Sequence, residues 1–157
     1  MSRAYVGIGG NLGNRRANLK AAVRKLRRIP QTRVLKTSSF QWSDPEGGED
    51  QPRYLNGAAE LESDLSPEKL LEQLLQIEAD LGRIRSIPKG PRTVDLDLLL
   101  FGKQAIQSRH LELPHPRITK RRFVLEPLSE LCPDTIIPGT RGSVLHHLQS
   151  LNKRERR

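Results

Sequence analysis

The order of periodic segments along this chain of 157 residues predicts an α+β fold, in which helices cover an antiparallel sheet. Three observations support this prediction. Two stretches repeat apolar residues at helical spacing, strand-like segments rich in apolar residues stand around them, and glycine and proline residues separate the segments. A chain of this length is expected to form one domain, so residues 1–157 are interpreted as a single unit with its own core.

The first predicted strand is Ala4–Ile8, and a glycine-rich turn over Gly9–Asn14 follows it. This turn resembles a dinucleotide-binding fingerprint, but Leu12 stands where that motif needs its third glycine. A turn that lets the backbone approach a ligand, or an ordinary strand-to-helix loop, fits the spacing better. A helix is then expected over Arg15–Arg28, because one of its faces is apolar. The residues of that face are Leu19, Ala22, Val23 and Leu26.

The middle of the chain predicts two more strands and a second helix. The strands are expected over Val34–Trp42 and Tyr54–Glu62, and the loop between them is longer than is usual in a hairpin. Ser66 followed by Pro67 predicts a helix start, and Gly82 stands where such a helix should end. The buried stripe of this helix is expected to be Leu70, Leu74, Ile77 and Leu81.

The segment Gly90–Gly102 predicts a further, buried strand that carries two aspartates. Because successive side chains of a strand alternate, Asp95 and Asp97 are expected on one face, about 7 Å apart. Two carboxylates so placed repel each other, and a divalent cation such as Mg²⁺ removes that repulsion. A strand end whose aspartates are solvated or paired with arginines is the alternative. The apolar residues are expected to divide between the faces, with Val94, Leu96, Leu98 and Leu100 opposite the aspartates and Leu99 and Phe101 beside them.

The resulting order is that of the ferredoxin-like β-α-β-β-α-β plait, with the helices on one face of the sheet. The last third of the chain adds C-terminal helices and a short hairpin. A helix is expected over Thr119–Leu131, which Pro127 must kink or restart. A short strand and turn follow over Thr135–Gly139, and Ser143 caps a final helix. Lys153–Arg157 is expected to be a frayed basic tail.

Composition limits the classes of partner. The chain has 27 Lys and Arg against 18 Asp and Glu, a net charge of +9, so its surface should attract anions. With only six aromatic residues, a surface that stacks nucleic-acid bases is not expected. Cys132 is the one cysteine and indicates no oxidising compartment. No apolar run predicts a membrane span or a signal peptide, so a cytoplasmic protein without a membrane partner is expected.

Four motifs occur along the chain in an order that is specific as a set. They are Gly9-x-Asn11-Leu12-Gly13, Asp50-Gln51-Pro52-x-Tyr54-Leu55-Asn56, the Gly90–Gly102 run, and Leu113-Pro114-His115-Pro116 with Arg121 and Phe123 beyond it. Together they resemble the 6-hydroxymethyl-7,8-dihydropterin pyrophosphokinase family of the folate pathway, over essentially the whole chain. The resemblance implies that ATP donates a pyrophosphoryl group to the hydroxymethyl oxygen of the pterin, with release of AMP. ATP and the pterin are then the expected partners of a monomer.

The resemblance also implies a role for each matching residue. Asp95 and Asp97 would bind two Mg²⁺ ions that bridge the ATP phosphates, and Asp95 would also face the substrate hydroxyl. Arg83 and Arg92 would act on the triphosphate and complete the catalytic set. The implied ATP-binding residues are Glu78, Arg85, Arg92, Leu98, His115 and Arg121. The implied pterin-binding residues are Ser43, Pro45, Tyr54, Asn56, Asp95 and Phe123, with the ring stacked between Tyr54 and Phe123.

Three loops of the chain are expected to be mobile parts of the active site. The loops Gly9–Asn14, Ser43–Arg53 and Arg83–Lys89 are expected to act as lids that exclude water. Lys89 stands where members of the family commonly carry an aromatic residue, which bears on how tightly the last lid closes.

Three other functions stay open. A basic RNA-binding plait lacks the aromatic pattern it would need, another nucleotide kinase lacks a G-x-x-x-x-G-K-[ST] loop, and a catalytically idle pterin- or ATP-binding protein would release no AMP.

Overall fold

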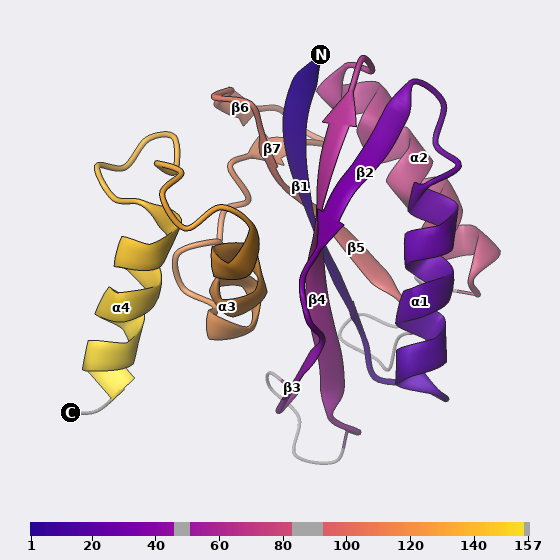
Figure 1. Ribbon diagram of the computed structural model, residues 1–157, viewed down its shortest axis with the longest axis horizontal. Coiled ribbons are helices and arrows are strands. Elements are labelled where there is room, and N and C mark those ends of the chain that lie inside the picture. Colours follow the sequence, from indigo (N-terminus) through magenta and orange to yellow (C-terminus); the bar gives the residue numbers. More distant parts are fainter. Residues whose placement is uncertain (46–50, 83–92, 156–157) are drawn as a thin grey trace.

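The computed structural model describes residues 1–45, 51–82 and 93–155, and within them the chain forms an antiparallel sheet with four helices (Figure 1). The strands pair in the order β2-β4-β1-β5, and β3 pairs with β4 as well. All of these pairs are antiparallel, so the expected α+β fold is confirmed. The strands of this sheet are β1 (Ser2–Gly10), β2 (Thr32–Thr37), β3 (Gln41–Ser43), β4 (Tyr54–Ser63) and β5 (Asp95–Phe101).

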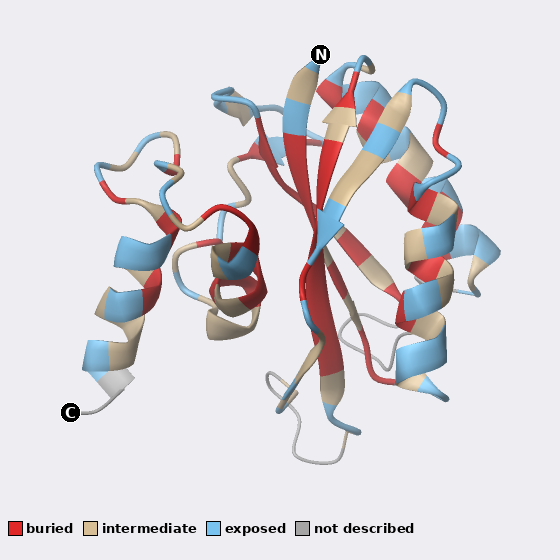
Figure 2. Ribbon diagram, in the orientation of Figure 1, coloured by how far each residue is buried: buried red, intermediate tan, exposed pale blue. Residues whose placement is uncertain are grey.

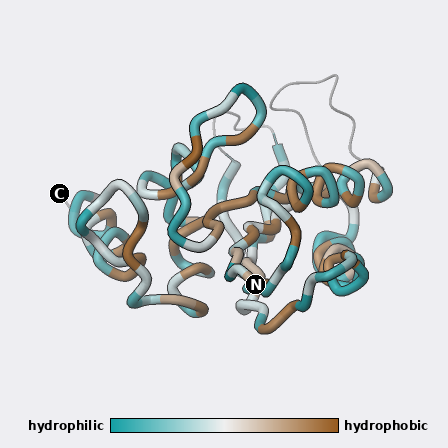
Figure 3. Tube along the Cα trace, turned by 90° about the horizontal axis from the view of Figure 1, so that it is seen from above, coloured by the Kyte–Doolittle hydropathy of each residue, from teal (hydrophilic) through white to brown (hydrophobic). Residues whose placement is uncertain are grey.

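The helices cover both faces of the sheet (Figure 1). On one face lie α1 (Arg15–Leu26) and α2 (Pro67–Asp80), and on the other lies α3 (Arg122–Leu131), with α4 (Val144–Glu155) packed against α3 on its far side from the sheet. Figure 2 shows that buried residues concentrate on the central strands and on the sides of the helices that face the sheet. Figure 3 shows the helical turns alternating between hydrophilic and hydrophobic residues, as one-sided burial requires.

Two apolar clusters stabilise this arrangement, one on each side of the sheet. The first joins α1 and α2 to the sheet through fully buried leucines, among them Leu19, Leu26, Leu70 and Leu74. The second joins the sheet to α3 and α4 through residues that include Tyr5, Leu99, Leu125, Leu128 and Val144. Burial of a leucine side chain contributes about 1.5–3 kcal/mol relative to leaving it exposed. Each helix pair is therefore fixed to its own face of the sheet mainly by apolar packing.

The helix ends follow the expected capping chemistry. The Asn14 side chain accepts a hydrogen bond from the Ala17 backbone N–H at 3.1 Å and begins α1. Ser66 Oγ accepts from the Lys69 N–H at 3.2 Å and begins α2, which confirms the predicted start. Gly82 adopts a positive φ of 86° directly after α2, a backbone conformation that favours glycine.

A β-bulge in β5 makes one predicted alternation wrong. Tyr5 of β1 lies opposite Leu100, whereas Val6 lies opposite Leu98, so Leu99 is an extra residue in the pairing. A bulge of this kind places consecutive side chains out of alternation. Leu100 consequently joins Leu99 in the cluster beneath α3, and Phe101 packs in the cluster beneath α1 and α2. The expected assignment held through Leu98 and failed for the two residues beyond the bulge.

The predicted second strand, Val34–Trp42, is also wrong as a single element. The chain forms β2 and β3 instead, because Ser38 interrupts the backbone ladder with its hydroxyl, which accepts a hydrogen bond from the Ala58 N–H at 2.8 Å. The expected strand at Thr135–Gly139 is only an isolated bridge between Ile136 and Ser143. A regular hairpin lies elsewhere, between β6 (Ile106–Gln107) and β7 (Glu112–Leu113).

Several helix boundaries differ from the expectation. The first helix ends at Leu26 rather than Arg28, and the third begins at Arg122 rather than Thr119. Pro127 is buried inside α3 and the helix continues through it, so the expected restart does not occur. The last helix continues through Lys153 to Glu155, so the expected frayed tail is helical over those residues. Among the described residues, no helix is long and apolar enough to cross a membrane.

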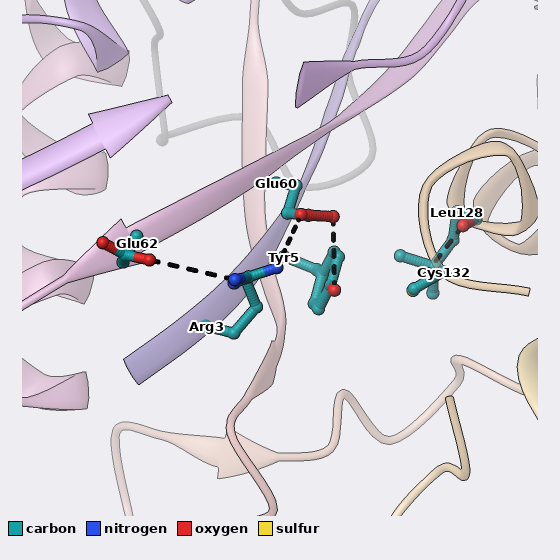
Figure 4. A network of polar contacts seen from close by, with 6 residues as sticks. All are labelled: Arg3, Tyr5, Glu60, Glu62, Leu128 and Cys132. Atoms are coloured by element: carbon teal, nitrogen blue, oxygen red, sulfur yellow. Dashed lines mark hydrogen bonds and ion pairs between the residues drawn. The ribbon is translucent and has the colours of Figure 1, made fainter. Parts of the chain in front are cut away.

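A buried polar network lies between the sheet and α3 (Figure 4). Glu60 of β4 accepts a hydrogen bond from Arg3 Nη1 at 3.0 Å and from the Tyr5 hydroxyl at 3.4 Å. Cys132, just after α3, donates from Sγ to the Leu128 carbonyl at 3.6 Å. Burial, and after it the proximity of Cys132 and Glu60, raises the pKa of Tyr5. Burial also raises the pKa of the Cys132 thiol to about 11.

We predict that Cys132 resists thiol reagents in the folded protein. The side chain is buried and its thiolate is scarce at pH 8, so a colorimetric disulfide reagent should react slowly in buffer and rapidly in denaturing urea. Because folding raises the pKa from 9.0 to about 11, the stabilisation linked to this thiol is complete below pH 9 and decreases as the pH rises toward 11. Equal reaction rates in buffer and in urea would contradict the prediction, and Cys132→Ser is the blank.

Candidate active site

A row of paired residues crosses the sheet from β5 to β3. Asp95 lies opposite Gly9 of β1, Gly9 lies opposite Asn56 of β4, and Asn56 lies opposite Gln41 of β3. Residues directly opposite in an antiparallel pair point to the same face, and here that is the face covered by α3. Gly9 has no side chain, and a Cβ there would lie 3.0 Å from Asn56 Oδ1. The absence of a side chain at Gly9 therefore lets the Asn56 amide lie close to the β1 backbone.

Asn56 is held by its neighbours on β3. Its side chain is 5% exposed, and Nδ2 donates to Ser43 Oγ at 2.7 Å and to the Gln41 carbonyl at 3.4 Å. Ser43 lies opposite Tyr54, so three of the predicted pterin residues come together on adjacent strands. The orientation of the Asn56 amide is thereby fixed before any ligand binds.

The other predicted pterin residues lie on neighbouring segments. Phe123 stands in the first turn of α3, the helix that packs against β4, and the Arg121 guanidinium lies 5.4 Å from its ring centroid. Pro45 follows β3 closely in the chain, and it is half-buried. The structure thus brings the predicted pterin residues to one region of the sheet and α3.

A second region is a cavity of about 270 Å³ along the outer edge of β5, between α2 and the segment around His115. Four predicted residues line it: Glu78, Asp97, Leu98 and His115. Glu78 is only 1% exposed, and its Oε2 accepts a hydrogen bond from the Leu96 backbone N–H at 2.7 Å. This glutamate therefore anchors the edge strand as well as lining the cavity.

Sequence reasoning missed several residues of the cavity wall. The additional lining residues are Leu71, Leu75, Leu96, His110, Leu111, Glu112 and Pro116. Leu75 carried a usable signal in the sequence, since it is a leucine outside the expected buried stripe of α2, and the structure leaves it 39% exposed. His110 and Glu112 carried none, because the β6–β7 hairpin that brings them to the cavity has too short a pattern to predict.

His115 stands at the wall of the cavity and is held by hydrogen bonds at its backbone N–H and at Nδ1. Its backbone N–H donates to the Leu99 carbonyl at 3.0 Å, and its Nδ1 accepts from the Arg117 N–H at 3.2 Å. Burial lowers the pKa of His115, the charges of Arg121 and Arg117 lower it further, and Glu112 opposes the shift. With Nδ1 accepting, the proton resides on Nε2, which can donate a hydrogen bond to an anion.

We predict that His115 titrates below pH 6.5 in the ligand-free protein. Protonation must compete with burial and with two arginines, so its ring resonances should shift with a midpoint under that of an ordinary histidine. Stability linked to this group is complete above pH 6.5 and decreases as the pH falls, because the unfolded chain binds the proton more readily. NMR of the histidine rings measures the midpoint, with His115→Gln identifying the signal. A midpoint at or above 6.5 would refute the prediction.

The two aspartates connect the two regions. Asp95 belongs to the row with Asn56, whereas Asp97 lines the cavity with Glu78 and His115. Their carboxylates share one face of β5, because Asp97 lies opposite Gly7 and Asp95 lies opposite Gly9. Among the described residues, no group of three or more His, Cys, Asp or Glu could hold a metal ion. Two carboxylates suit an ion that takes its other ligands from a bound phosphate.

The loop after β1 contacts the end of the chain segment that precedes β4. Asn11 Nδ2 donates to Gln51 Oε1 at 3.2 Å and to the Pro52 carbonyl at 3.1 Å. Beside them, the Trp42 ring is 44% exposed and lies 5.2 Å from the Arg15 guanidinium and 5.9 Å from that of Arg53. The predicted residues Arg83, Arg85, Lys89 and Arg92, and with them the third predicted lid, lie outside the described residues.

Comparison with known proteins decides the family. A family model described as 7,8-dihydro-6-hydroxymethylpterin-pyrophosphokinase matches residues 5–133. The chain belongs to this pyrophosphokinase family. A 2-amino-4-hydroxy-6-hydroxymethyldihydropteridine pyrophosphokinase of Pseudomonas aeruginosa is 44% identical over 141 residues, which cover 90% of this chain and 87% of that protein. The Bacillus subtilis enzyme of the same name is 46% identical over 129 residues, covering 82% and 77%.

Solved structures support the fold independently. The chain superimposes on Plasmodium falciparum HPPK-DHPS with pteroate at a TM-score of 0.81 and 11% sequence identity. The superposition covers 99% of this chain and 43% of that longer one, so the chain spans less than half of it. At this identity the likeness concerns the fold alone. The family assignment rests on the sequence matches, which also imply an ATP-using enzyme that needs a divalent metal.

Proposed function

We propose that the two regions described above form one catalytic centre, in which the pyrophosphoryl group of ATP is transferred to 6-hydroxymethyl-7,8-dihydropterin. As a member of the pyrophosphokinase family, the protein is a transferase of folate biosynthesis that releases AMP. One observation carries the proposal. Asp95 stands in the row with Asn56 while Asp97 lines the cavity, so a pterin site and a nucleotide site would meet at a pair of carboxylates.

The pterin would bind over the sheet beside Gly9 and Asn56. Its flat ring would stack between Tyr54 and Phe123, and Asn56 Oδ1 would accept a hydrogen bond from the ring edge while Nδ2 keeps its bonds to Ser43 and the Gln41 carbonyl. The support is that Asn56 is buried and already oriented by Ser43. Ser43 and Pro45 would add contacts from the start of the following loop. A stacked ring with one oriented amide gives both contact area and specificity.

ATP would occupy the cavity along the edge of β5. Leu71 and Leu75 supply an apolar wall, and Leu98 lies on the edge strand, whose backbone can hydrogen-bond a nucleotide base. Glu78 would contribute mainly by holding that strand in place. The neutral His115 would donate from Nε2 to a phosphate or ribose oxygen.

Cationic side chains would bind the triphosphate. Arg121 precedes α3 near the cavity residue His115, and its charge acts on that histidine. Arg83, Arg85 and Arg92 are proposed from the family resemblance. Phosphoryl transfer depends chiefly on positioning and charge neutralisation, which is what arginines around the transferring group provide.

We propose Mg²⁺ as the metal, with two ions held by Asp95, Asp97 and the ATP phosphates. The carboxylates fit this group, since hard oxygen ligands on one face of a strand suit a hard divalent cation. Bound there, the ions would neutralise phosphate charge at both the attacking and the leaving oxygen. Asp95 would also accept a hydrogen bond from the pterin hydroxyl and so orient its oxygen toward the transferring group.

The domain organisation and the topology of the sheet are part of the proposal. We propose that residues 1–157 act as one pyrophosphokinase domain and that the path β1-α1-β2-β4-α2-β5 is a ferredoxin-like plait. The strand order β2-β4-β1-β5 supports this, with β3, α3 and α4 as additions. A cytoplasmic monomer without nucleic-acid or membrane partners, and lids formed by the three loops, stay predictions.

The decisive test is the nucleotide product. With ATP, Mg²⁺ and the hydroxymethyl dihydropterin, the protein should release AMP in equal amount to the pterin diphosphate. ADP as the product would mean transfer of a single phosphoryl group and would overturn the assignment. Binding of both substrates without any AMP would identify a catalytically idle binding protein. Chromatography of the nucleotides distinguishes all three results.

We predict that Asp97→Asn abolishes turnover while leaving pterin affinity nearly unchanged. The substitution keeps the size of the side chain but removes a metal-binding charge, and loss of one ligand from a two-metal centre should cost several kcal/mol in the transition state. AMP release measures turnover, and calorimetry measures pterin binding. Asp80→Asn, a surface aspartate that pairs with Lys25 at 3.9 Å, is the matched control. Turnover near the wild-type rate in Asp97→Asn would remove Asp97 from the metal site.

We predict that Asn56→Ala weakens pterin binding by roughly 1–3 kcal/mol, because polar groups on the ring edge lose their partner. ATP binding should hardly change, since Asn56 lies on the other side of the aspartates. Titration calorimetry with each ligand tests both statements. Asn152→Ala, which removes a hydrogen bond to Arg122 far along the C-terminal helix, is the control. If both ligands weaken equally, Asn56 supports the strands rather than the pterin.

A further inference from the structure

The edge of the sheet bends between β2 and β3, directly beside the proposed pterin site. Ser38 pairs with Ala58 through its backbone N–H at 2.9 Å and through its hydroxyl, which accepts from the Ala58 N–H at 2.8 Å. The same hydroxyl donates to the Ser39 carbonyl at 2.8 Å. Phe40 then packs over Gly57, where a Cβ would lie 2.7 Å from its ring. Ser38–Phe40 leave the regular ladder, with one residue more than the facing part of β4, before β3 resumes pairing.

The bend decides where the pterin-side residues stand. Immediately after it, Gln41 lies opposite Asn56 and Ser43 lies opposite Tyr54. Ser43 and the Gln41 carbonyl are the groups that orient the Asn56 amide. A shift of the bend would therefore change the direction of the Asn56 side chain without any substitution at the site itself.

Helix α3 holds this bend through one carboxylate. Glu130 Oε1 accepts from the Ser39 backbone N–H at 3.1 Å, and the Ser39 hydroxyl lies 3.0 Å from Oε1 and 2.9 Å from Oε2. Glu130 lies seven residues after Phe123 on the same helix, about 10 Å along its axis. One end of α3 thus bears the proposed stacking ring, and the other end binds the strand that orients Asn56.

We propose that Glu130 is a positioning residue for the pterin site: apolar packing holds α3 on β4, and by binding the Ser38–Phe40 segment Glu130 fixes the position of β3, and with it the direction of the Asn56 amide, relative to that helix. This inference rests on the proposed function. Ser39 and Glu130 are both exposed, and an exposed charge that met only another charge would contribute little to such an arrangement. Glu130 instead binds a backbone N–H in a bend and a hydroxyl at the same time, so its contact has a defined direction.

A purely structural role for Glu130 gives a different set of results. If the carboxylate only stabilised the fold, its loss would lower the melting temperature and affect both substrates alike. A positioning role affects the pterin selectively, because the cavity proposed for ATP is formed by α2, β5 and the His115 segment. The selectivity between the two substrates is therefore the informative measurement.

The experiment compares Glu130→Ala, Glu130→Gln and Ser39→Ala with wild type. We expect Glu130→Ala to raise the Kd and KM for the pterin about tenfold while those for ATP change less than about twofold. Glu130→Gln keeps one oxygen acceptor, so its Kd and KM for the pterin should lie between those of wild type and those of Glu130→Ala. The double variant Glu130→Ala/Ser39→Ala should bind the pterin no more weakly than the weaker of the two single variants. Both substitutions disrupt the same contact, so their effects should not add. Calorimetry and steady-state kinetics are measured together with the melting temperature.

Glu126→Ala is the matched control, since Glu126 lies one turn earlier on α3 and pairs within the helix with Arg122 at 3.6 Å. It should leave both substrates unchanged. Wild-type pterin affinity in Glu130→Ala, or equal weakening of both substrates, would overturn the positioning role while wild-type AMP release still stood. Failure of the wild-type protein to release AMP or to bind the pterin would refute the proposed function and this inference with it. A low yield of Glu130→Ala leaves Glu130→Gln and Ser39→Ala to decide.

Discussion

The outer edge of β5 is anchored by a buried carboxylate, and the candidate site depends on that anchor. An edge strand presents unpaired backbone groups, which are costly when they are buried. Here Glu78 of α2 accepts from the Leu96 N–H, and the His115 N–H donates to the Leu99 carbonyl, while β1 pairs along the other side. The strand that carries Asp95 and Asp97 is therefore fixed from both sides. Rigidity of this kind is what a site that must align two substrates requires.

The two buried glutamates illustrate how charge is accommodated on opposite sides of one sheet. Glu78 lies on the α2 side of the sheet and accepts a hydrogen bond from a backbone N–H. Glu60 lies on the α3 side and accepts hydrogen bonds from Arg3 and Tyr5. Removing the partners of either would leave a charge in an apolar region at a cost of several kcal/mol. Each glutamate also joins elements distant in the sequence, so the core is specified by directional contacts as well as by apolar packing.

Local signals in the sequence predicted the helices and the strand carrying the aspartates, since Ser66, the leucine stripes and the alternation around Asp95 depend on nearest neighbours. The bulge at Leu99 and the split at Ser38 escaped prediction, because each results from pairing with a distant strand. His110 and Glu112 reach the cavity only through a hairpin of two-residue strands. The sequence indicated Asp95 and Asn56 as site residues in separate motifs. It did not indicate that they lie in one row across the sheet, because that alignment depends on β1 lying between β4 and β5.

The position of Trp42 has a spectroscopic consequence. It is the one tryptophan in the chain, and its half-exposed indole lies between Arg15 at the start of α1 and Arg53 just before β4. Tryptophan fluorescence, excited at wavelengths that tyrosine does not absorb, consequently originates at a single place, beside the loops that flank the proposed pterin site. Any rearrangement there alters the solvent and the cationic groups around the indole. The protein thus contains an intrinsic optical reporter for this corner of the molecule, without the attachment of a dye.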